Sequence, residues 1–276
     1  MKTLITSVLL ILFSVTALAK GSSEQQTLSK ARKLFEQKNF KEALVEYDKI
    51  ITQSDRYLMV LEEKAWTYIH LDQMNKALAA SRTLTSPALS GLTTTEPFLL
   101  RALVQLKLCD YLGVFQTLKD FRTQKREQVV AIQEIAQKQR NSISRQILEQ
   151  WMKDTANWKS LGPNLAKMPQ LFYTDSFMLA AAKAKSLSRL EKRLQQLAVV
   201  ENNENHRILQ KLNLIEVEGV QRVHIATQFN NKQGETLDKS DDDLVFKDSK
   251  DDIWLDELDS YQATVDRCEK KSGRTM

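Results

Sequence analysis

The chain has 276 residues, 42% of them hydrophobic and 27% charged, with a formal net charge of +5. It contains only 7 Gly and 4 Pro, which argues against the many turns of an all-β fold and favours long helices. Residues 231–276 hold 13 acidic and 8 basic side chains, a local −5, which leaves +10 on residues 1–230. A basic body with an acidic tail predicts contact between the two or binding of acidic partners.

Residues 1–19 have the pattern of a secretory signal peptide. Lys2 supplies the basic start, Leu4–Leu18 form a short apolar run, and Ala17-Leu18-Ala19 fits the small-x-small cleavage rule. We therefore expect cleavage after Ala19 and export to a bacterial periplasm; the alternative is an uncleaved N-terminal anchor. No later apolar run approaches the roughly 20 residues of a membrane span, so we expect no transmembrane span in the mature chain.

A sequence repeat begins near residue 28 and predicts stacked helical hairpins. Two copies are offset by 34 residues and a third follows at an offset of 37. Small residues at fixed sites would let paired helices approach closely, and large apolar residues would fill the space between hairpins. The three copies are Ala31, Leu34, Phe40, Ala43, Leu44, Tyr47; then Ala65, Tyr68, Met74, Ala77, Leu78, Ser81; then Ala102, Gln105, Tyr111, Val114, Phe115, Leu118.

This pattern resembles the tetratricopeptide repeat (TPR) family over residues 28–123. The matching run extends from Ala31 to Ile50, and Trp66, Tyr68 and Lys76-Ala77-Leu78 follow in the second copy. The chain departs from the family by lacking the proline near the repeat end and by placing Lys38 and Asp72 where the turn glycine is expected. We assign residues 20–123 to a repeat domain of about three hairpins; the alternative is an unrelated array of helical hairpins.

The resemblance implies that the first helix of each hairpin lines a concave groove that binds a peptide or a partner helix. Trp66 is also explained by packing between repeats, and His70 by a solvated helix end. The groove residues that the resemblance implies are Arg32, Phe35, Glu36, Glu62, Trp66, Ile69, His70, Leu103 and Lys107.

Residues 124–228 carry two apolar stripes at helical spacing, one ending at Trp151 and one running from near Asp175 to about Gln228. The first continues the second helix of the third hairpin, and Pro163 and Pro169 mark the break between the two. We predict long, coiled-coil-like helices that pair antiparallel within the chain. The alternative is a parallel dimer, because Leu187–Leu197 includes a heptad step.

Residues 229–250 read as an acidic, flexible linker, and residues 251–276 as an amphipathic segment. Within that segment, apolar residues from Trp254 to Val265 share one helical face with Cys268. We expect the segment to dock on the body of its own chain, with a disulfide between Cys109 and Cys268. The alternatives are two unrelated thiols and a segment that binds another protein.

No recognised catalytic or metal-binding motif occurs. His70, His206 and His224 are not in a zinc-like spacing, and there is no H-E-x-x-H, G-x-S-x-G or glycine-rich phosphate loop. Asp241–Asp243 fail as a calcium loop, since Asp243 and Ser249 stand where Gly and Glu are needed. We therefore predict no catalytic residue, no metal and no cofactor.

These observations predict a non-enzymatic periplasmic TPR scaffold that mediates protein–protein interactions in a cell-envelope complex. An exported protein has little access to nucleic acid, so protein partners are expected. The ending from Trp254 to Tyr261 resembles TPR proteins of bacterial gliding-motility envelope machines. The alternatives are a structural spacer that forms homo-oligomers through residues 178–225, and an envelope enzyme.

Overall fold

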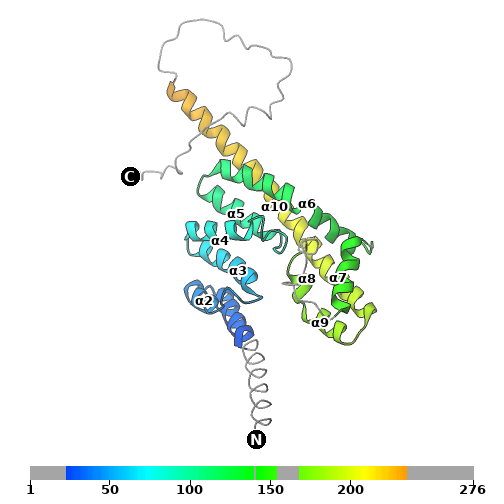
Figure 1. The fold of residues 1–276 in the computed structure, drawn as a ribbon. Helices are drawn as coiled ribbons and strands as arrows, with labels where there is room; N and C mark the ends of the chain where they lie inside the picture. Colours follow the sequence, from blue (N-terminus) through cyan, green and yellow to red (C-terminus); the bar gives the residue numbers. More distant parts are fainter. Residues whose placement is uncertain (1–22, 140, 154–167, 235–276) are drawn as a thin grey trace, which may run out of the picture.

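The computed structural model describes residues 23–139, 141–153 and 168–234 (Figure 1). In these residues every regular element is a helix, which confirms the predicted all-α fold class. The predicted signal peptide, the C-terminal segment 251–276 and all but the start of the predicted linker lie outside the described residues. None of the helices described here is both long and apolar enough to span a membrane.

Three helical hairpins form the N-terminal half. Helix 23–36 is followed by α2 (Phe40–Tyr47), α3 (Tyr57–His70) by α4 (Met74–Leu84), and α5 (Glu96–Lys107) by α6 (Tyr111–Ala136). The small repeat residues are fully buried, as expected where two helices approach closely. They are Ala31, Ala43, Ala65, Ala77 and Ala102.

The turn of each hairpin contains a non-glycine residue in the left-handed region. Lys38 has φ 63° and Asp72 has φ 57°, at the two positions where the repeat pattern lacks its glycine. The Lys38 amide donates to the Phe35 carbonyl, and the Asn39 amide donates to the Leu34 carbonyl, each at a distance of 2.9 Å. This pair of hydrogen bonds is the Schellman motif, which satisfies the last carbonyls of a helix. The same geometry recurs at Cys109, Lys138 and Lys185.

Two of these turns correct the predicted long helices. The helix expected to run on to Trp151 ends at Ala136, and α7 (Ser142–Met152) begins after Asn141, whose side-chain oxygen accepts the Ser144 amide at 2.7 Å. Neither glycine nor proline marks this break. Lys138 adopts the left-handed conformation and Asn141 caps the next helix. The helix therefore ends at residues whose types only weakly predict a helix end.

The second long helix is also interrupted. Asp175, near the predicted start of this helix, caps the short α9 (Ser176–Lys183), which follows the single turn α8 (Leu171–Thr174). After the turn at Lys185, α10 (Leu187–Gly234) runs for 48 residues. The predicted end at 228 is therefore wrong by six residues, because α10 continues into the segment assigned to the linker.

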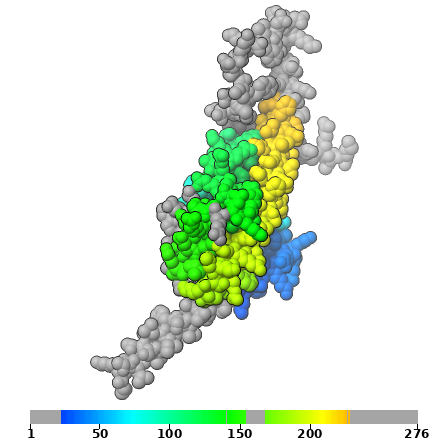
Figure 2. Space-filling model, turned by 90° about the vertical axis from the view of Figure 1, so that its right-hand side faces the viewer, coloured from blue at the N-terminus to red at the C-terminus, as the bar shows by residue number. Residues whose placement is uncertain are grey.

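Helix α10 ties the hairpins to the rest of the chain. It runs antiparallel to α6, since Arg122 pairs with Glu216 at 2.5 Å while Phe115 lies against Gly219 further along α10. Figure 2 shows α6 and α10 side by side along the molecule. The predicted intramolecular, antiparallel pairing is thus present. The first part of α10 packs in a second core, formed with α7, α8, α9 and the end of α6 around Trp151 and Phe172.

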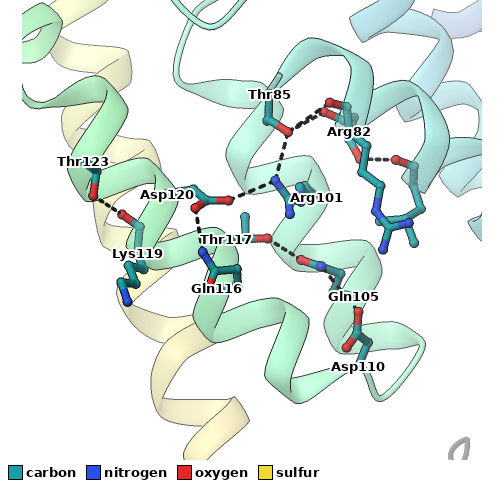
Figure 3. A network of polar contacts seen from close by, with 12 residues as sticks. Arg82, Thr85, Arg101, Gln105, Asp110, Gln116, Thr117, Lys119, Asp120 and Thr123 are labelled. Carbon is teal, nitrogen blue, oxygen red and sulfur yellow. Dashed lines mark hydrogen bonds and ion pairs between the residues drawn. The ribbon is translucent and has the colours of Figure 1, made fainter. Parts of the chain in front are cut away.

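A polar network fixes the third hairpin (Figure 3). Arg101 on α5 donates to Thr85 at 3.2 Å and pairs with Asp120 on α6 at 3.3 Å. Thr117 donates to the Gln105 side chain at 2.6 Å. These contacts join α4, α5 and α6, so the turn at Cys109 is held in place from both sides.

Candidate functional site

The surface predicted as a groove is partly filled by α10. Leu99 and Leu106 on α5 pack in one buried cluster with Ile208, Leu212 and Ile215 of α10. Leu103, a predicted groove residue, is partly buried against this cluster and against the core of the second hairpin. At the third hairpin, the chain's own helix therefore covers the inner face that the repeat pattern assigns to a partner.

Three predicted groove residues of the second hairpin, Glu62, Trp66 and Ile69, are drawn into packing. Ile69 is buried in the core between α3, α4 and α5, so its side chain does not face a groove. The Trp66 indole Nε1–H donates to Glu96 at 2.7 Å. Glu62 accepts from the Thr94 hydroxyl at 3.3 Å. The position of Trp66 is therefore explained by its packing against α5, and that of Glu62 by its hydrogen bond to the loop before α5.

The first hairpin keeps its predicted residues accessible. Arg32 and Glu36 are exposed, and so are His70 at the end of α3 and Lys107 at the end of α5. Arg32 pairs with Glu63 at 2.6 Å. The partly exposed Phe35 meets His70 edge to face, with ring centroids 5.4 Å apart.

A buried charged cluster lies between the hairpins and α10. We define the interior polar cluster as Glu62 on α3, Glu96 on α5, Lys125 on α6, and Glu201 and Asn205 on α10. The Lys125 side chain is only 1% exposed and its Nζ donates to the Thr93 carbonyl at 2.7 Å and to the Gln128 side chain at 2.9 Å. It also donates to the Ser90 carbonyl. Lys125 thus holds the loop between α4 and α5 against α6.

Helix α10 completes this cluster. The Asn205 side-chain oxygen accepts from the Thr95 hydroxyl at 2.7 Å. Glu201 is 6% exposed and Asn205 4%. Within the described part of the chain, Glu201 Oε1 and Asn205 Nδ2 have no hydrogen-bond partner. Such groups are costly to bury, and this cost offsets part of the packing of α10 on the hairpins.

Burial shifts the ionisation of the cluster toward neutral forms. Burial lowers the pKa of Lys125 to about 7, against the attraction of Glu201 and Glu62. Burial raises the pKa of Glu201 to about 7, against the attraction of Lys125. Loss of water around the carboxyl group, and then repulsion by Glu96, raises the pKa of Glu62. Glu201 and Lys125 therefore change charge near neutral pH.

Sequence reasoning missed this cluster, because no motif links residues 62, 96, 125 and 201. The only signal was the interruption of the apolar stripe of α10 at Glu201–His206. Lysine is normally exposed on a helix, so nothing in the sequence indicates that Lys125 is buried as the structure shows.

Cys109 lies in the turn between α5 and α6, with φ 57°, and is buried. It is not a free thiol. Cys268 lies outside the described residues, so its pairing with Cys109 stays a prediction. Among the residues that the structure describes, no three His, Cys, Asp or Glu side chains are grouped as metal ligands.

Comparisons with known proteins add no family assignment: no protein-family model, no curated protein and no solved structure was found to match the chain. The resemblance to TPR proteins accordingly continues to rest on the repeat residues alone.

Proposed function

We propose that the protein is a non-enzymatic scaffold that binds protein partners in a bacterial cell-envelope complex after export to the periplasm. The observation that carries the proposal is the packing of α10 on the inner face of α5 through Ile208, Leu212 and Ile215. This contact supports the idea that the inner face of the array suits an amphipathic helix. A helix or peptide from a partner would use the same kind of surface on the neighbouring hairpins.

The open part of that surface lies at the first hairpin. Arg32 and Glu36 offer charges of both signs, and Phe35 with His70 offers an aromatic pair. A mixed polar rim around an aromatic anchor is the usual composition of a protein-binding site. We therefore place partner binding at Arg32, Phe35, Glu36 and His70.

The test uses charge reversal at the exposed residues. The mature protein carrying Arg32→Glu and Glu36→Lys should lose crosslinked partners from envelope extracts, with unchanged helical content by circular dichroism. The matched control reverses the exposed Lys41 and Glu42 on α2 and should keep them. Equal capture by both variants would contradict binding at the first hairpin, and a protein that captures nothing would contradict the scaffold function.

Substitutions of Glu62 and Trp66 are unsuitable for this test. Trp66 bonds to Glu96 at the start of α5, and Glu62 bonds to Thr94 in the segment just before α5. Their loss would disturb packing together with any binding.

A structural spacer is the second candidate, favoured by the outward face of α10. This face exposes large apolar side chains, and such surfaces are typical of association sites. Light scattering on the mature protein separates the two functions: a monomer opposes the spacer, and an oligomer that survives the Arg32 and Glu36 reversal supports it. The exposed residues are Val199, Val200, Leu209, Leu214, Val217, Val220 and Ile225.

A further inference from the structure

A groove runs between α6 and α10. Part of it is a hollow of about 410 Å³. Phe121, Val129 and Val130 of α6 and Leu209 of α10 supply apolar wall, and the 46% exposed Val130 is accessible from solvent. By helical spacing, Val220 on α10 and Leu112 on α6 continue this strip toward the turn at Cys109, and both are exposed.

The charge along this groove is mainly positive. Arg122 and Arg126 line the hollow, and Lys119 follows on the same side of α6 by helical spacing. Glu216 is the acidic neighbour, and it is paired with Arg122. An occupant of this groove should therefore combine an apolar stripe with an acidic surface.

The chain itself contains a segment of this chemistry. Residues 251–268 carry six acidic side chains and one basic side chain, Arg267. Trp254, Leu258, Tyr261 and Val265 share one helical face with Cys268, through steps of four and three residues. By helical spacing, Asp251 and Glu257 flank the apolar face and would meet the basic rim of the groove, while the apolar face would meet its floor.

We propose that residues 251–268 dock as a helix in the α6/α10 groove, with Cys268 bonded to Cys109 and Trp254 in the hollow. The lengths agree with this register. A helix from Trp254 to Cys268 spans about 21 Å, because each residue rises about 1.5 Å. The same length along α6, measured from Cys109, ends near residue 123, beside the Phe121 end of the hollow.

The connection is also long enough. Helix α10 ends at Gly234, beyond the start of α6, as Figure 1 shows. Residues 235–253 then have to return to the hollow. An extended chain of this length reaches about 60 Å, well above the roughly 40 Å that the rise of the two helices implies. The proposal does not depend on the scaffold function.

The test measures the stability of the disulfide in the full mature protein. Equilibration with glutathione gives the effective concentration of the two thiols: Cys109 and Cys268 pass two electrons and two protons to oxidised glutathione, which leaves as two reduced molecules. Docking holds the thiols together, so Trp254→Ala should lower this effective concentration at least tenfold. Ala263→Ser, on the opposite face of the segment by helical spacing, should change it less than twofold.

A second pair of variants tests the groove. Val130→Glu places a negative charge in the hollow and should also lower the effective concentration about tenfold. Val45→Glu on α2, where the native valine is 60% exposed, is the matched control and should leave it unchanged. Equal effects of the two glutamates, a disulfide between two copies of the chain, or two free thiols at equilibrium would each overturn the proposal.

Discussion

Replacement of Glu201 by glutamine should remove a pH dependence from the stability of this protein. Glu201 is buried on α10 beside Lys125, and burial raises its pKa from 4.5 to about 7. In the unfolded chain the carboxyl group loses its proton near pH 4.5, whereas in the folded chain it keeps the proton until about pH 7. Between these values the folded state binds more protons, so the free energy of unfolding falls as pH rises.

The magnitude follows from the shift. Each pKa unit corresponds to about 1.4 kcal/mol, and integration from pH 5 to pH 8 gives a loss of about 2–3 kcal/mol for this group. Glutamine has nearly the same shape and does not titrate. The difference in the free energy of unfolding between Glu201→Gln and the wild type should therefore change by about 2–3 kcal/mol between these two pH values, in favour of the variant at pH 8.

Urea unfolding followed by circular dichroism at pH 5 and pH 8 measures this difference. The matched control is Glu218→Gln, further along α10, where the carboxylate pairs with Arg222 at the surface. The free energy of unfolding of this control should change between pH 5 and pH 8 as that of the wild type does. If the free energy of Glu201→Gln also changed as that of the wild type does, Glu201 would be solvated in the folded protein and the assignment of a buried cluster would be wrong.

Two further predictions concern a turn and a buried hydrogen bond. Lys38→Gly should raise the free energy of unfolding by about 0.5–1 kcal/mol, because Lys38 is held at φ 63° and glycine adopts that region without strain. Lys33→Gly, in the last turn of helix 23–36, should lower it by up to about 1 kcal/mol. A loss of stability in both variants would refute the strain at Lys38. Trp66→Phe should cost about 1–2 kcal/mol through the lost bond to Glu96, measured by urea unfolding. A double-mutant cycle with Glu96→Ala should abolish this cost, and an unchanged cost in that background would show that the bond contributes nothing.

The sequence by itself determined the hairpins. Helix periodicity and the alanines at Ala31, Ala65 and Ala102 act over one or two turns of chain, so local spacing was enough to place them. It could not locate the helix ends at Lys138 and Lys185, because a left-handed lysine is held by backbone hydrogen bonds that composition does not reveal. Asn141 is a common capping residue, but without glycine or proline nearby it was a weak signal of a break.

Only the tertiary structure decided what fills the groove and which charges are buried. Leu99 and Ile208 meet across more than a hundred residues of sequence, and so do Thr95 and Asn205. Contacts at that separation depend on how the turns direct α10, and not on the spacing within any one helix. Lys125 has the same local sequence environment as a solvated lysine; its burial, and with it the pKa near 7, arises only when α10 and the loop before α5 close over it.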